Sequence, residues 1–294
     1  MPHNPPHLMH IKNTILAAAA TIGMTVSSYA ATYATGDLLV GFVATGGISS
    51  NQTLIVNLGS SASFRDGFDS GTFRLNFRNI GAALNSQFSP NLGDTPWYDR
   101  TDLRINIYGS TSSNTVGEDL VNLDPFRTSY VSRSRTAATG STATYSVANN
   151  AGMTTAASQI QTTTGTFQLA TETSPGVAVV NDSPNSVDQF TRPAVSPGSA
   201  FGAFSNGIDQ TFSAGSLLTF PGVGPVEAAL DLYRLQAVND VPGQYGSGAA
   251  IRTGAYKGTF TLSNTGAISF VPEPSSTVVL GLTGLLGLLR RRRA

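Results

Sequence analysis

The chain has 294 residues, no cysteine, three histidines and a formal net charge of zero. Glycine is abundant and charged residues are few, a composition that favours β structure with many turns over helices. All three histidines lie within the first ten residues. If that end is removed, the remaining chain excludes Ser-His-Asp catalysis, Cys-His catalysis, zinc held by histidine, and disulfides.

The first 30 residues are predicted to be a secretory signal peptide. Lys12 supplies a positive flank, and Ile15–Val26 is a short apolar run rich in alanine. Small residues follow the run, so we expect signal peptidase to cleave after Ala30. Met9 is an alternative to Met1 as the start of the chain. A buried core helix is the alternative interpretation of the apolar run.

Residues 31–270 are predicted to form one β-rich extracellular body, mainly β and β-sandwich-like, with one or two short helices. Two segments, Asp37–Ala44 and Thr53–Leu58, are almost continuously apolar, which is typical of buried strands. Weaker patterns predict four further strands, Thr142–Val147, Thr166–Ala170, Ser216–Phe220 and Ala229–Leu235.

Period-two alternation is clearest in three segments. Leu103–Tyr108 places its apolar residues on one face and its polar residues on the other. Tyr256–Ser263 and Ala267–Phe270 alternate in the same way and are separated by Asn264-Thr265-Gly266. Alternating segments joined by such a turn predict a β-hairpin.

Helices are expected to be few. Asn79–Phe88 has apolar residues at helical spacing, with Asn79 as a capping residue and Pro90 beyond its end. Ala151–Gln161 is a second helical segment of weaker pattern. Ser174–Phe201 is dense in proline, glycine, serine and asparagine and is predicted to be a loop.

Candidate functional side chains gather in one acidic and aromatic stretch that contains Asp94, Trp97, Asp99 and Asp102. Carboxylates beside aromatic rings can bind sugar, hold Ca²⁺ or form the acid pair of a glycoside hydrolase. The alternative, which we favour, is a solvated loop in which Trp97 packs on the sheet and Arg100 or Arg104 pairs with the acids. No catalytic residue and no metal ligand is therefore assigned.

The remaining charged groups are interpreted as solvated. Glu118-Asp119 and Asp124-Pro125 are expected in exposed loops, and the arginines at 127, 133 and 135 on one exposed strand face. Without its two ends the body has a net charge of about −5. A negative body gives no reason to expect nucleic-acid binding.

The last 24 residues have three physical parts. Pro272-Glu273-Pro274 should be extended, because each proline fixes its own φ and pushes the preceding residue toward an extended conformation. Ser275–Leu289 carries no charge and predicts a short single transmembrane helix, roughly 22 Å long. Arg290, Arg291, Arg292 and Arg293 should remain cytoplasmic and leave the body outside. A plain membrane anchor is the alternative.

This combination resembles the PEP-CTERM sorting signal of exported bacterial proteins, at residues 271–294. The resemblance implies an inner-membrane-tethered precursor whose signal a membrane-embedded exosortase removes, and then a location at the cell surface or outside the cell. The body is also similar to a type of exported PEP-CTERM body, through segments at 36–42, 54–59, 97–104 and 128–133. That group implies no enzymatic activity.

Two classes of function follow as expectations. The first is a structural or adhesive protein, associated with extracellular polysaccharide or biofilm, without catalysis or cofactor. The second is a secreted glycoside hydrolase that uses only carboxylates, or a calcium- or glycan-binding module. A hydrolase needs two carboxyl groups about 5–9.5 Å apart, one of them partly desolvated.

Overall fold

The computed structural model describes residues 31–44, 46–65, 74–111, 124, 128–135, 150–181, 210–211, 218–220, 222–235 and 254–272. The predicted signal peptide, with Ala30, and the sorting segment from Glu273 to Ala294 lie outside the described residues, as does the predicted strand Thr142–Val147. Within them, no helix has both the length and the apolar character needed to cross a membrane.

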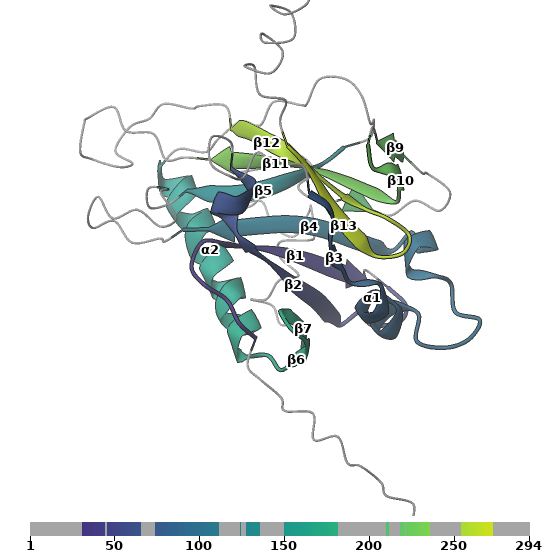
Figure 1. The fold of residues 1–294 in the computed structure, drawn as a ribbon. Helices are drawn as coiled ribbons and strands as arrows, with labels where there is room; N and C mark the ends of the chain where they lie inside the picture. The colour runs from purple at the N-terminus through teal and green to yellow at the C-terminus, as the bar shows by residue number, and fades with distance from the viewer. Residues whose placement is uncertain are drawn as a thin grey trace, which may run out of the picture.

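One 11-stranded antiparallel sheet dominates the described chain (Figure 1). In pairing order its strands are β3 (Arg74–Asn79), β13 (Ala267–Pro272), β12 (Ala255–Leu262), β11 (Ala228–Leu235), β5 (Ser129–Ser134), β4 (Leu103–Ser110), β1 (Asp37–Ala44), β2 (Gln52–Ser60), β7 (Val177–Asn181) and β6 (Glu172–Ser174). The short β8 (Gln210–Thr211) pairs with the start of β4.

The other elements cover the sheet or connect its strands. They are the α-helices α1 (Gly81–Phe88) and α2 (Asn150–Leu169), the 3₁₀ turns η1 (Ser61–Phe64) and η2 (Trp97–Asp99), and the separate hairpin of β9 (Leu218–Phe220) and β10 (Gly224–Val226).

The mainly β class is confirmed, and so are the strongest strand predictions. β1 has the predicted bounds, and β12 pairs with β13 as the predicted hairpin. Both helices are present, α2 being longer than expected. The N-cap of α1 is Ile80 and not the expected Asn79, which is the last residue of β3. The Asn79 side-chain oxygen nevertheless accepts a hydrogen bond from the N–H of Gly81 at 3.0 Å.

Two of the predictions about local secondary structure are wrong. Thr166–Ala170 is not a strand, since α2 runs to Leu169. Its threonines favour a strand locally, but Ile160 and Phe167 lie seven residues apart on one helix face and are both buried, so tertiary packing decides. Ser174–Phe201 is not all loop, because β7 lies within it and pairs with β2.

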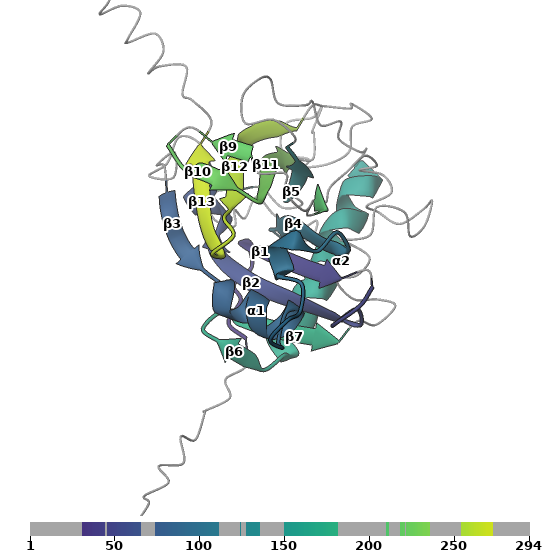
Figure 2. The same cartoon turned by 90° about the vertical axis from the view of Figure 1, so that its right-hand side faces the viewer.

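The large sheet curls on itself in place of the two stacked sheets of a sandwich (Figure 2). β3 and β6 stand at opposite ends of the pairing order, yet Arg78 of β3 donates a hydrogen bond to the carbonyl of Pro175, in the turn between β6 and β7. The two edges of the sheet therefore meet through this arginine. Burial lowers the pKa of Arg78, and the charge of Glu172 partly offsets that effect.

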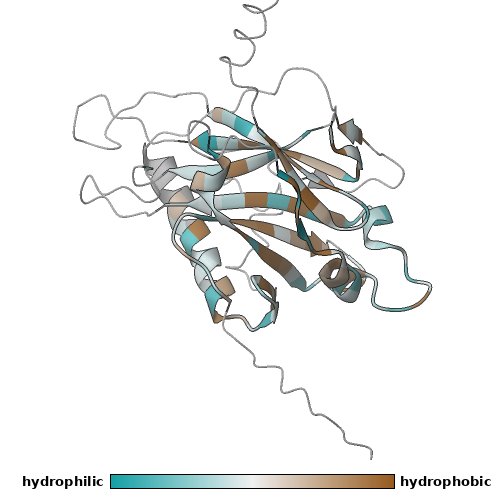
Figure 3. Cartoon of the chain, viewed as in Figure 1, coloured by the Kyte–Doolittle hydropathy of each residue, from teal (hydrophilic) through white to brown (hydrophobic). Residues whose placement is uncertain are grey.

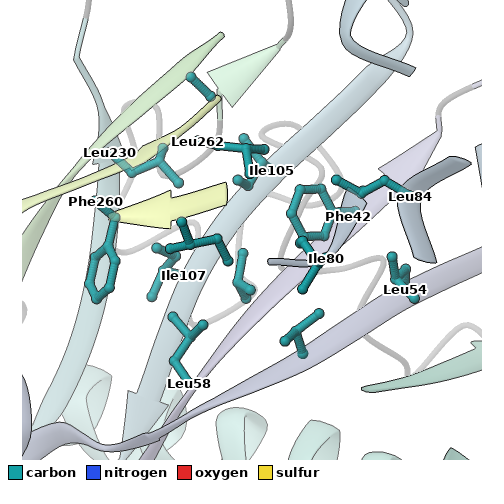
Figure 4. Packing of buried hydrophobic residues seen from close by; sticks show 14 of the residues in the cluster. Phe42, Leu54, Leu58, Ile80, Leu84, Ile105, Ile107, Leu230, Phe260 and Leu262 are labelled. Atoms are coloured by element: carbon teal, nitrogen blue, oxygen red, sulfur yellow. The ribbon is translucent and has the colours of Figure 1, made fainter. Parts of the chain in front are cut away.

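The concave face of the sheet encloses the main hydrophobic core. Side chains from β1, β2, β4, β11 and β12 point into it and meet Ile80 and Leu84 of the α1 segment (Figure 4). Near one end, the Phe64 ring packs against those of Phe260 and Phe270, with centroids 4.9 and 5.2 Å apart. The inward residues alternate along each strand, as a half-buried pleat requires.

The outer face of the central strands is also covered. Leu39, Ile55 and Tyr108 point outward from β1, β2 and β4 and pack against Ile160 and Phe167 of α2. Burial strongly raises the pKa of the Tyr108 hydroxyl. All eight residues of β1 are buried: its inward side chains belong to the main core, and Leu39 on its outer face packs in the α2 cluster.

Two glycines allow α1 to approach the β12–β13 turn. A Cβ on Gly266, whose φ is +79°, would lie 2.3 Å from the Cα and N of Gly81. Gly59 has a similar φ of +89°, but a Cβ there would meet nothing within 4 Å.

Gly266→Ala should therefore destabilise the protein more than Gly59→Ala. Holding an alanine in the left-handed conformation costs roughly 1–2 kcal/mol, and both variants lose this much stability. The backbone clash adds roughly 1–3 kcal/mol at Gly266 only. Urea denaturation of both variants and the parent measures the difference, and equal losses would show that the contact with α1 has no energetic role.

Candidate functional site

An open hollow of about 600 Å³ lies beside the C-terminal end of α1. The β1–β2 turn forms one side through Gly47 and Ile48, and the segment after α1 forms the other. The candidate acids Asp94, Asp99 and Asp102 all line this hollow. Figure 3 shows that the long loop beyond α1, which carries these residues, is mostly polar.

Arg100 is the centre of this region. It is 7% exposed, and its Nε and Nη2 donate to the two carboxylate oxygens of Asp102 at 2.9 and 2.7 Å. Its Nη1 donates to the carbonyls of Phe88 and Ile48, and Nη2 also donates to that of Gly46. All five N–H groups of a guanidinium can be satisfied by this set.

The acids in the hollow have different partners. Hydrogen bonds from Arg100 lower the pKa of Asp102 below its usual value and outweigh partial burial. Asp94 accepts a hydrogen bond from the N–H of Asn91 at 2.8 Å and so stabilises its own turn. The acid that pairs with Arg100, as the favoured interpretation of the sequence expected, is Asp102.

Trp97 does not face the hollow. It is 1% exposed and belongs to the main core, where its ring meets that of Tyr98 edge to face at 5.4 Å. Stacking on a sugar needs an accessible ring face, and Trp97 presents none to the hollow. The carboxylates that line the hollow therefore have no tryptophan platform beside them from this residue.

A carboxylate that sequence reasoning did not select interacts electrostatically with Asp99. Glu227 precedes β11, is 8% exposed, and its N–H donates to the carbonyl of Leu262. Burial raises the pKa of Glu227, and the negative charge of Asp99 raises it further. An acid with a raised pKa beside a second carboxylate is the electrostatic pattern of an acid–base pair. No motif in the sequence indicates this interaction.

Asp124 corrects the prediction of an exposed acidic loop. Its side chain is completely buried, Arg65 lies 3.1 Å away, Arg234 forms a second ion pair, and the Tyr130 hydroxyl donates to it at 2.6 Å. Burial strongly raises the pKa of Tyr130, and the charge of Asp124 adds to that rise. A buried carboxylate needs such partners, so this cluster is structural. Glu118 and Asp119 lie outside the described residues.

Arg135 corrects the prediction of a solvated arginine face. Its Nη1 lies 3.0 Å from the Asp231 carboxylate, and its guanidinium stands over the Phe220 ring at 5.8 Å. Asp231 is 3% exposed and also accepts from the hydroxyl of Thr259. Arg133 is partly buried, and Arg127 lies outside the described residues.

The start of the C-terminal motif belongs to the sheet. Pro272 is the last residue of β13 and stands opposite Gly258 of β12. Proline is tolerated there because a strand end need not donate a ladder hydrogen bond. Glu273, Pro274 and the arginines at 290–293 follow outside the described residues.

Comparison with known proteins identifies this C-terminal segment. Residues 270–293 match the family model of the PEP-CTERM protein-sorting motif. The chain therefore carries a PEP-CTERM sorting motif at its C-terminal end, consistent with an exported substrate of an exosortase. No curated protein and no solved structure matches the chain.

Among the described residues, no group of three or more acidic or histidine side chains is arranged to hold a metal ion. The hollow offers one arginine-paired acid, Asp102, and a second acid, Asp99, whose negative charge interacts with Glu227.

Asp102→Asn should weaken the acid dependence of stability. The folded pKa of Asp102 is lowered from an unfolded value of about 3.9, so its contribution is present above that pH and is lost as the pH falls further. Urea denaturation between about pH 2 and pH 6 should show that the free energy of unfolding falls less steeply with decreasing pH in the variant than in the parent.

The matched control is the same change in an Arg100→Gln background. In that background the carboxylate has already lost its cationic partner, so Asp102→Asn should change the loss of stability at acid pH little. An equal effect in both backgrounds would contradict the role given to Arg100.

Proposed function

We propose that this protein is an exosortase-sorted component of the cell surface or extracellular matrix, whose β-rich body acts by contact, adhesive or polysaccharide-associated, without catalysis. The observation that carries the proposal is the PEP-CTERM motif at residues 270–293. A signal peptidase would act first at Ala30, leaving a precursor held in the inner membrane by Ser275–Leu289, before the exosortase acts.

The environment of the candidate acids supports a non-catalytic body. Asp102 is neutralised by Arg100, Asp94 stabilises a turn, and Trp97 is enclosed in the core. General acid–base catalysis requires acids that can exchange protons with a bound substrate. Two of the three candidate aspartates have structural partners that account for their position.

One observation favours a second function, a carboxylate-dependent hydrolase. The pKa of Glu227 is raised first by burial and then by Asp99, and Asp99 also lines the open hollow. In a glycoside hydrolase the acid of raised pKa would protonate the leaving oxygen, and the second carboxylate would act as nucleophile or base. This pair gives the alternative defined residues to test.

Replacing Pro272, Glu273 and Pro274 together by alanine should leave an uncleaved species in the inner membrane. Alanine is compatible with the end of β13, so the body should still fold. Fractionation with immunoblotting measures the retained species. Alanine at Ser275, Ser276 and Thr277 is the matched control and should be processed. Release of the first variant at the parental rate would refute the sorting proposal.

The body should release no reducing ends from a panel of polysaccharides. Asp99→Asn and Glu227→Gln test the alternative, and Asp94→Ala and Asp102→Ala test the other acids of the hollow. We expect the same absence of turnover in the parent and in every variant. Turnover that is present in the parent and disappears with any of these variants would establish the hydrolase.

A further inference from the structure

The first residues of the described chain are held by several separate elements. Ala31 is 4% exposed, packs in the cluster between α2 and the sheet, and donates its N–H to the carbonyl of Ala170 at 3.1 Å. The carbonyl of Thr32 accepts a hydrogen bond from the side-chain amide of Asn57 in β2 at 2.8 Å. The carbonyl of Tyr33 accepts one from the side-chain amide of Gln168 in α2 at 3.2 Å.

Glu172 of β6 places a carboxylate next to this buried segment. One of its oxygens accepts from the N–H of Thr32 at 3.0 Å and from the N–H of Gly176 at 2.9 Å. Neighbouring backbone nitrogens are less than about 4 Å apart, so the nitrogen of Ala31 lies within about 7 Å of that oxygen. A negative charge is thus positioned beside a residue that the sequence predicts to become the N-terminus.

We propose that Ala170 and Glu172 form an N-terminal socket that binds the α-ammonium group of Ala31, so that removal of the signal peptide completes the folded body. The inference rests on the proposed export, through cleavage after Ala30. Hydrolysis adds water across the Ala30–Ala31 bond, leaving a carboxylate on Ala30 and an amine on Ala31 that takes a proton at neutral pH.

The chemistry of the socket suits an ammonium better than an amide. The amide N–H of Ala31 makes one bond, whereas an ammonium has three donors and a full charge. The carbonyl of Ala170 retains one donor, and a freed terminus can rotate to direct another at the Glu172 carboxylate. Charge-assisted hydrogen bonds of this kind are roughly twice as strong as neutral ones.

The other ionisable groups near the socket leave a negative balance. Arg78 of β3 interacts electrostatically with Glu172 but donates its hydrogen bond to the carbonyl of Pro175. The carboxylate of Asp37 accepts hydrogen bonds from the N–H of Ala34 and the side chain of Asn57. Burial raises the pKa of Tyr33 to about 12, which keeps it neutral. The sequence of α2 contains no charged residue.

A double-mutant comparison on the exported full chain tests the socket. Glu172→Gln removes the charge but keeps an oxygen for the N–H groups of Thr32 and Gly176. The second change inserts Gly-Ser between Ala30 and Ala31, which moves the ammonium two residues away after cleavage. N-terminal sequencing verifies each mature start, and thermal denaturation measures stability.

In the parental background, Glu172→Gln should lower the melting temperature by roughly 2–4 °C. In the Gly-Ser background, Glu172→Gln should lower the melting temperature by less than half as much, because the ammonium no longer faces the carboxylate. Equal shifts in both backgrounds would overturn the socket while leaving export intact. Export with a mature start other than Ala31 would also overturn it, whereas a retained signal peptide would instead refute the proposed function.

Discussion

The burial of β1 on both faces is the constraint on which the rest of the structure depends. A strand whose eight residues are all buried needs an apolar layer on each side. The curl of the sheet supplies the inner layer, because strands distant in the pairing order turn back over β1. Helix α2 contributes to the outer layer through its packing with Leu39, and the chain before β1 is held against the end of that helix.

Charged groups close both ends of the curled core in a chain that has no cysteine. At one end Arg100 joins the β1–β2 turn to the last turn of α1. At the other end Arg65, Asp124 and Arg234 form a buried ion cluster with Tyr130. Both sets fasten segments distant in sequence, as cross-links do, and breaking one partner of a buried ion pair is strongly destabilising.

Elements specified by their own residues could be predicted from the sequence. β1 is an almost continuous apolar run, and the β12–β13 hairpin combines alternation with Asn-Thr-Gly, so local patterns sufficed. The end of α2 was missed because its threonines favour strands until Phe167 packs on the sheet. The curl, the partners of Asp124 and the interaction of Glu227 with Asp99 depend on pairing between strands that are distant in sequence, which no local pattern encodes.

The shared residue at the end of β13 has a mechanical consequence. Because Pro272 belongs both to the sheet and to the sorting motif, the motif begins inside the folded body. Tension on that segment would be transmitted directly to β13, which is flanked by β12 on one side and β3 on the other. The resistance of that strand to extraction then limits how far the motif can be drawn away from the body.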